Sequence, residues 1–275
     1  MRVLSACGGL NPRPLGARSA ITVAHAIAGV GGWVGLTMGG TIVTLGPTAV
    51  RTRMDPRAVD LASLALPVWA AGLLAAVVGA LAGHMRAVAA GLAVVGLAAA
   101  AGIAYPLARA AMRKGPSEYG SWSMCLGTAW ILVGVAVVTQ HAWATGTGEQ
   151  LRAANLPWLP IIGAGGLGQV FIGALTYLMP VVIGGGPRAV RVGVGALETA
   201  APMREAARNA ALVLLAAATT SQAPAAAPLA TACWAVVLAT YLADIVLMAR
   251  AGAAQARART APPSPSPSNT GGPRG

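Results

Sequence analysis

Charge-free apolar stretches, each long enough to cross a lipid bilayer, constrain this chain more than any other feature. A transmembrane helix needs about 20 mostly apolar residues, because the hydrocarbon core is roughly 30 Å thick and each helical residue rises about 1.5 Å. Lipid offers no hydrogen-bond partner to backbone groups, so such stretches must be helical. Five of them are residues 21–50, 61–82, 87–108, 121–144 and 156–183. They predict an all-α, polytopic transmembrane helical bundle.

The last apolar block, residues 209–243, is too long for a single span. Its middle holds the polar residues 219–222, followed by Pro224 and Pro228, a composition that favours a hairpin turn. Two helices, 206–220 and 229–248, are therefore expected, which gives about seven spans. Arg208 is expected to extend its side chain to the membrane interface, so that the shorter helix can cross.

The distribution of basic residues predicts the orientation. With seven spans, five of the 19 Lys and Arg residues fall on the side of the N-terminus and fourteen on the other side. Basic residues collect on the cytoplasmic side of membrane proteins, so the bundle is expected to be N-out/C-in. We therefore expect a multi-pass protein of the plasma membrane whose immediate partner is the lipid bilayer.

The low charge content excludes several function classes. Only 9% of the residues are charged, against about 25% in soluble domains. The net charge of +12 is spread singly or in pairs between apolar stretches. Nucleic-acid binding needs a clustered basic surface, so no nucleic-acid partner is expected. The sequence has no P-loop, nucleophile elbow, HExxH pair or CxxC pair, and thus no motif that indicates an enzyme.

Three regions follow from the composition. Residues 1–19 form a polar N-terminal leader, and residues 20–250 form the transmembrane bundle. Residues 251–275 end in a Pro/Ser/Gly-rich sequence that cannot bury a core, which predicts a disordered cytoplasmic tail.

Helix 1, residues 21–50, carries two stripes of small residues. Glycines at four-residue spacing line one face and threonines line the opposite face: Gly31, Gly35 and Gly39, and Thr37, Thr41, Thr44 and Thr48. A glycine stripe lets another helix approach closely, and two packing faces predict a helix buried within the bundle. The alternative is that the threonines line a path for a substrate or a proton.

Four polar residues stand inside the predicted spans: Gln169, Thr176, Tyr241 and Asp244. An unpaired amide in hydrocarbon is costly, so Gln169 needs a partner on another helix, either as structural glue or in a polar cavity. A carboxylate within a span is a functional candidate. Asp244 lies six residues before Arg250, so pairing near the cytoplasmic interface is the alternative for it.

The three histidines, His25, His84 and His141, all fall at the outer membrane face in this topology, and Met85 follows His84 directly. Imidazoles with a thioether suit copper, and paired imidazoles suit heme. The three residues are therefore candidate metal ligands. Ordinary polar residues at the membrane interface are the alternative.

Two segments carry a family resemblance. The stretch from His25 to Met54, with GWVGLT, and the stretch GQVFIGALTYLMPVVIGGGPRAV at 168–190 resemble actinobacterial membrane proteins distantly similar to the heme-copper oxidase large subunit and to NnrS-type proteins. That group often has an HxHLN motif before the first segment. His25 matches its first histidine, whereas Ile27 and Gly29 stand where the second histidine and the asparagine would be.

The resemblance implies a heme- or copper-associated membrane protein of respiratory or nitric-oxide metabolism. A heme-copper oxidase core resembles twelve helices with about six histidine ligands. The seven predicted spans and three histidines of this chain therefore imply a protein that is not catalytic alone. It is expected to be either a divergent member or the later part of a longer protein. Two alternatives stay open: a small-molecule or ion transporter, and a non-catalytic membrane subunit or assembly factor with a membrane partner subunit.

Overall fold

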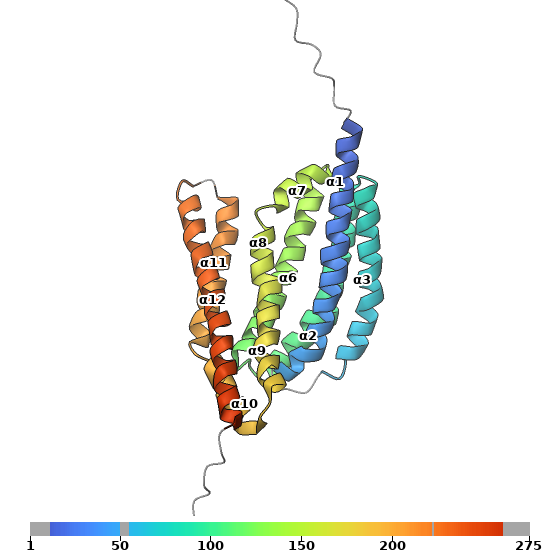
Figure 1. The fold of residues 1–275 in the computed structure, drawn as a ribbon. Helices are drawn as coiled ribbons and strands as arrows, with labels where there is room; N and C mark the ends of the chain where they lie inside the picture. Colours follow the sequence, from blue (N-terminus) through green and yellow to red (C-terminus); the bar gives the residue numbers. More distant parts are fainter. Residues whose placement is uncertain (1–11, 50–54, 222, 261–275) are drawn as a thin grey trace, which may run out of the picture.

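The computed structural model describes residues 12–49, 55–221 and 223–260, and within these ranges the chain is helical without a β-strand (Figure 1). The elements are α1 (Pro12–Ala26), η1 (Ile27–Val34), α2 (Gly35–Ala49), α3 (Ala58–Leu81), α4 (Met85–Ala99), η2 (Ala100–Ala104), α5 (Tyr105–Arg113), α6 (Tyr119–Ala144), α7 (Gly148–Asn155), α8 (Leu159–Ile162), η3 (Gly163–Gly168), α9 (Gln169–Ile183), α10 (Gly186–Leu197), α11 (Ala201–Thr220) and α12 (Ala226–Thr260). The predicted all-α polytopic bundle is confirmed.

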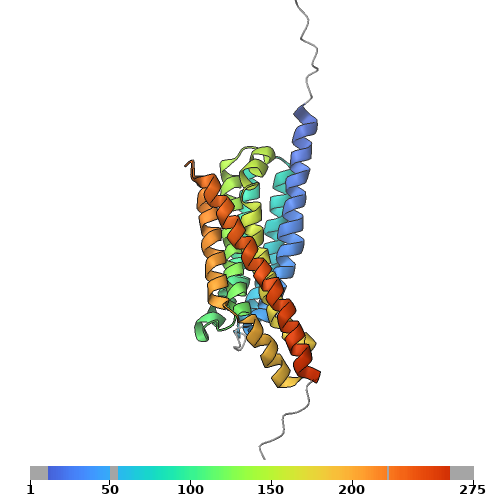
Figure 2. The ribbon, with the colours of Figure 1, turned by 60° about the vertical axis from the view of Figure 1, so that its left-hand side comes forward.

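Six helical segments of the described chain are long and apolar enough to cross a membrane, one fewer than predicted. They are α1–η1–α2, α3, α4–η2–α5, α6, α8–η3–α9 and α12. The seventh, α11, runs beside α12 along the bundle (Figures 1 and 2), but Arg204, Glu205 and Arg208 lie in its first half. With three charged residues among its 20, α11 is less apolar than the six candidate spans and is not counted as one of them.

The two ends of the bundle are named here after the predicted orientation. The outer end holds the beginning of α1 and the short helix α7, and the inner end holds α10 and the end of α12 (Figure 1). Figure 2 shows α12 crossing diagonally over α11 and reaching α10 near its lower end, and α12 packs against both helices.

Both predicted terminal regions contain helix. The chain is already helical at Pro12, within the predicted leader, and α12 continues to Thr260, ten residues into the predicted tail. Residues 1–11 and 261–275, the rest of these regions, lie outside the described residues. Two short helices were not predicted: α7 follows the N-cap Thr147, and α10 is an amphipathic helix with exposed arginines.

Three of the six candidate spans contain a π-helical segment. These segments are η1, η2 and η3, and η3 consists of glycines with one alanine and one leucine. π-Helical turns are rare and occur mostly as bulges at functional positions. In the span α8–η3–α9 the α-helix is therefore replaced by a π-helical segment that ends directly before Gln169, the first residue of α9.

The predicted glycine stripe of the first span packs against side chains rather than against another backbone. A Cβ added to Gly31, Gly35 or Gly39 would meet Leu73, Trp69 or Ile103, at 2.8, 3.1 and 2.6 Å respectively. The indole nitrogen of Trp69 also donates a hydrogen bond to the Gly31 carbonyl, at 3.1 Å. The stripe thus faces α3 and η2.

The prediction that helix 1 is buried on both faces is wrong. Thr37, Thr44 and Thr48 are exposed, and each hydroxyl donates to a carbonyl three or four residues earlier in the same helix. A threonine whose hydroxyl is satisfied by its own helix can face lipid without an unpaired polar group. At Thr37 and Thr44 the threonine face is therefore an outer surface of the bundle, whereas Thr41 is half-buried and Thr48 lines a cavity at the inner end.

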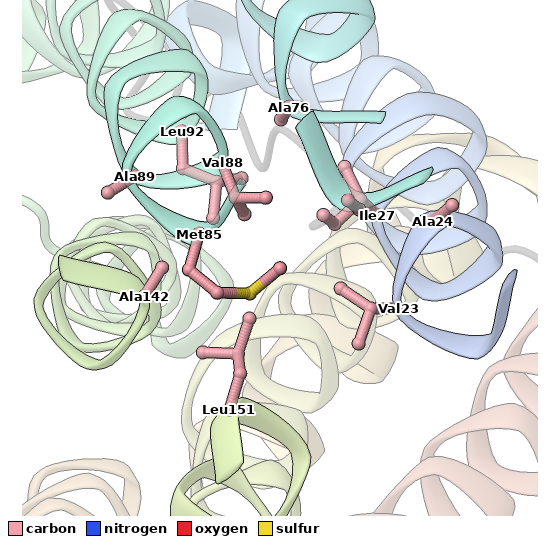
Figure 3. Packing of buried hydrophobic residues seen from close by; sticks show 11 residues of the cluster. Val23, Ala24, Ile27, Ala76, Met85, Val88, Ala89, Leu92, Ala142 and Leu151 are labelled. Carbon is pink, nitrogen blue, oxygen red and sulfur yellow. The ribbon is translucent and has the colours of Figure 1, made fainter. Parts of the chain in front are cut away.

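The outer end is closed by an apolar cluster that joins the first span to α4 and α7. Figure 3 shows the Met85 side chain reaching between Val23 of α1 and Leu151 of α7, and all three residues are buried. The short helix α7 is thereby fixed across the outer ends of the longer helices. Burial of these side chains is worth about 1.5–3 kcal/mol each.

Candidate functional site

A buried ionic network lies where α6, α11 and α12 meet toward the inner end of the bundle. Its centre is Asp244, whose side chain is fully buried. The carboxylate accepts a hydrogen bond of 2.6 Å from the Tyr119 hydroxyl and forms ion pairs with Arg204 and Arg208. Because a buried charge is tolerated only when it is paired and hydrogen-bonded, these three partners explain how Asp244 is accommodated inside the bundle.

The two guanidinium groups are held in different ways. Arg204 donates to the carbonyls of Leu197 and Thr199, at 2.5 and 3.0 Å, which ties the start of α11 to the end of α10. Its guanidinium carbon lies 4.0 Å from the centre of the Tyr119 ring. Arg204 is therefore both an ion-pair partner and a connector between helices.

Arg208 lies deeper and is completely buried. It donates to the Tyr119 hydroxyl at 2.8 Å and to the Thr240 hydroxyl at 3.2 Å, and its guanidinium carbon lies 4.1 Å from the centre of the Tyr241 ring. Its Nη1 is buried and has no hydrogen-bond partner among the described residues. The prediction that Arg208 extends to the interface is wrong, because Asp244 draws it into the protein.

A second hydrogen-bonded group of polar side chains starts at Glu205, next to Arg204 on α11, and extends away from the inner end; the two groups together are called the network below. Glu205 accepts hydrogen bonds from the hydroxyl of Ser123 and from the amide of Asn209, the latter at 3.3 Å. Asn209 exchanges two hydrogen bonds with Gln169, at 3.0 and 3.1 Å. The Asn209 carbonyl oxygen also accepts from the Trp130 indole at 2.9 Å. The donors that hold Glu205 are thus neutral.

The network covers a large part of the membrane thickness. Tyr119 and Trp130 are eleven residues apart on α6, which corresponds to about 16 Å along the helix, roughly half of a hydrocarbon core. Beyond Asn209, the next turn of α11 enters a cluster of apolar residues that includes Leu212, Leu215 and Val237. Polar contacts therefore extend from the inner end to about the midplane and meet an apolar layer there.

A polar cavity adjoins the network at the inner end. Its volume is about 210 Å³, and its lining includes Glu118, Ser121, Thr176, Leu197 and Glu198. Glu198 accepts a hydrogen bond of 2.9 Å from the backbone N–H of Tyr119, and Leu197 supplies a carbonyl to Arg204. Residues on the cavity wall are thus bonded directly to residues of the network.

The structure brings three of the four predicted intramembrane polar residues into one network. Gln169 and Asp244 are members of it, and Tyr241 packs beneath Arg208 while its hydroxyl donates to the Ala164 carbonyl at 2.5 Å. Thr176 lies outside the network: its hydroxyl donates to carbonyls of its own helix, and the residue lines the inner cavity.

Sequence reasoning missed the contribution of α11. Polar residues stand at positions i, i+1, i+4 and i+5 of this helix: Arg204, Glu205, Arg208 and Asn209. On a helix this spacing gathers them on one face, next to the apolar residues that follow. That pattern, combined with an acidic residue in the neighbouring helix, was the available signal for a buried network.

The three histidines do not form a metal site in the structure. His25 and His84 are exposed, and Nδ1 of His141 lies 3.0 Å from the side-chain oxygen of Asn155. All three are at the outer end, on α1, before α4 and on α6. Within the part of the chain that the structure describes, no group of three or more His, Cys, Asp or Glu side chains could hold a metal ion. These residues therefore do not fit the copper site that the resemblance implies.

This arrangement leads to a prediction for metal content. In the detergent-purified protein, supplied with copper and heme, the double variant His25→Ala/His141→Ala is expected to match the wild type in absorption spectrum and metal analysis. The reason is that the exposed His25 ring and the Asn155-bonded His141 ring supply no common site. A Soret band or one copper per chain that disappears in the variant would contradict it.

Comparisons with family models, with curated proteins and with solved structures found no match for this chain.

Proposed function

We propose that this chain is a transport protein of the plasma membrane that moves protons, and that the network of α6, α9, α11 and α12 is the inner half of the path. The observation that carries the proposal is two neighbouring groups of buried, hydrogen-bonded polar side chains. One group surrounds Asp244 on the span α12 and is bonded to the wall of the inner cavity, and the other surrounds Glu205 on α11 and extends to about the midplane. Intramembrane ionisable groups characteristically mark ion pathways and proton relays.

The two carboxylates of the network have different roles in this proposal. Asp244 is bound to two guanidiniums and a phenol, an arrangement that holds the three helices together. Glu205 is bound to the neutral donors Ser123 and Asn209. A carboxyl with neutral donors can take up and release a proton without breaking such an ion pair, so Glu205 is the proton carrier.

The apolar layer above Asn209 acts as the gate. Leu212, Leu215 and Val237 close the outer side of the network, so a proton can cross only when this layer rearranges. The π-helical η3, which lies beside Trp130 through Gly165, gives the span next to the layer an irregular backbone. Interrupted helices of this kind are typical of transporter spans next to a binding site.

The proposal predicts that proton flux depends on Glu205. Wild-type protein in sealed liposomes is expected to take up protons under a potassium diffusion potential, read by a pH-sensitive dye inside the vesicles. Glu205→Gln keeps the shape of the side chain and its bond to Ser123 but removes the titratable group, so flux is expected to fall to that of empty liposomes.

The matched control is Glu149→Gln, at an exposed carboxylate on α7 at the opposite end of the bundle. Its flux is expected to equal that of the wild type. Wild-type flux no higher than that of empty liposomes would refute proton transport, and unchanged flux in Glu205→Gln would remove Glu205 from the path.

A further inference from the structure

A second cavity, separate from the network, lies between the first span and helices α6 and α8. Its volume is about 270 Å³, close to the lower end of the range for small-molecule pockets. The first span contacts α3 along its side and α7 at its outer end, and through α2 it contacts α5, α6 and α9 at the inner end. The cavity is therefore a crevice closed at both ends, which we call the lateral crevice.

The lateral crevice opens sideways, where the bundle faces the membrane. Val30 of η1 and Leu159 of α8 line it and are 57% and 55% exposed, so they form the two edges of the opening. Both residues belong to segments long and apolar enough to span a membrane. Whatever enters from the side must therefore come from the lipid.

The lining is almost entirely apolar. On the first span the wall consists of Gly31, Gly35 and Gly39 together with apolar side chains such as Met38 and Ile42. An apolar cavity of this kind does not hold water well, because water needs two to four polar partners. A hydrocarbon chain is the molecule that matches this lining and this opening.

Polar lining residues gather near the outer end. Arg152 and Asn155 lie on α7 and Thr22 on α1, and Arg152 is the one charged side chain among the described lining residues. Arg152 is half-exposed and pairs with Glu149 at 2.8 Å, and this hydrogen bond holds the pKa of the Glu149 carboxyl below its ordinary value. A cationic group at the end of an apolar crevice complements an anionic headgroup with an attached chain.

We infer that the lateral crevice binds one acyl chain of an anionic phospholipid, with the phosphate at the outer end beside Arg152. This site is independent of the proposed proton path, since the crevice and the network occupy opposite faces of α6: Val135 and Thr128 line the crevice, whereas Ser123 and Trp130 bond to α11.

The first test fills the crevice. Delipidated protein in detergent is mixed with dioleoylphosphatidylglycerol, and the bound lipid is counted by native mass spectrometry. Val135→Phe enlarges a half-buried side chain of the lining and is expected to lower the bound lipid about tenfold. The matched control is Val133→Phe on the same helix, at an exposed residue outside the lining, which is expected to bind lipid like the wild type.

The second test removes the cation. Arg152→Gln is expected to lower affinity for dioleoylphosphatidylglycerol about fivefold while leaving that for dioleoylphosphatidylcholine unchanged. Glu149→Gln keeps Arg152 and is expected to retain the preference for the anionic lipid. Equal lipid binding by the wild type, Val135→Phe and Val133→Phe would refute the crevice as the site. Equal binding of the two lipids by the wild type would refute the role of Arg152.

Discussion

Replacing Asp244 by asparagine is expected to lower the free energy of unfolding by about 3 kcal/mol, because removing one partner of a buried ion pair leaves the other charge uncompensated. In the Asp244→Asn variant both Arg204 and Arg208 lose their ion pair, because both guanidinium groups pair with this one carboxylate. Arg208 is completely buried and cannot reach water without moving α11. The decrease in the free energy of unfolding is therefore expected to be larger than for any exposed Asp→Asn substitution in this protein.

The measurement is the unfolding equilibrium of the purified protein in detergent, followed by tryptophan fluorescence. Asp60→Asn is the matched control, because Asp60 is exposed in the first turn of α3. This control is expected to differ from the wild type by less than about 0.5 kcal/mol. An Asp244→Asn variant as stable as Asp60→Asn would show that the ion pairs do not hold α11 and α12 in place.

Replacing Gly173 by leucine is expected to destabilise the protein by about 2–3 kcal/mol through overpacking between α6 and α9. A Cβ at Gly173 would lie 2.7 Å from the carbonyl oxygen of Gly120 and 2.8 Å from Met124. The Gly120 oxygen belongs to the backbone and cannot rotate away, so this clash is removed only if α6 and α9 move apart. Gln169 stands one turn away on α9 and pairs with Asn209 on α11, so a shift of α9 would strain that pairing as well.

Gly40→Leu is the matched control, because Gly40 is exposed on α2 and a Cβ there meets nothing within 4 Å. Leucine favours helix over glycine, so this control is expected to be at least as stable as the wild type. The stability of both variants is measured by the same fluorescence titration. Similar stability of the two leucine variants would contradict the close approach of α6 and α9.

The sequence predicts the helices better than it predicts which side chains pair between them. The six apolar spans follow from length and hydropathy, because a bilayer permits a continuous apolar segment little other than a helix. For α11 hydropathy gives the wrong position of a side chain, because it places Arg208 at the membrane interface, whereas Arg208 is buried. Its burial depends on Asp244, 36 residues later, and on Tyr119. Hydropathy within one helix contains no information about such a partner.

Helix 1 shows that the spacing of small residues does not by itself predict which faces of a helix pack. The spacing of its glycines and threonines was evident, and the glycine stripe does pack against neighbouring side chains. The threonine stripe does not, because each exposed threonine bonds to its own helix. A threonine hydroxyl can be satisfied either locally or across an interface, and spacing alone does not distinguish the two.

The order of the spans places the three histidines at one end of the bundle, but it does not give the distances between them. Figure 1 shows α1, which carries His25, and the end of α3, which precedes His84, at that end. Ligand geometry requires side chains within a few ångström of a common point. In the described structure no such group of three forms, and the buried polar network lies instead toward the inner end.

The most direct test of the proposed function is the proton flux of wild-type and Glu205→Gln protein, reconstituted in parallel at equal density. We predict wild-type flux above that of empty liposomes and no such excess in the variant, with both proteins unfolding at the same denaturant concentration. Equal flux in the two preparations, or no flux above empty liposomes in either, would contradict the account of the network as a proton path.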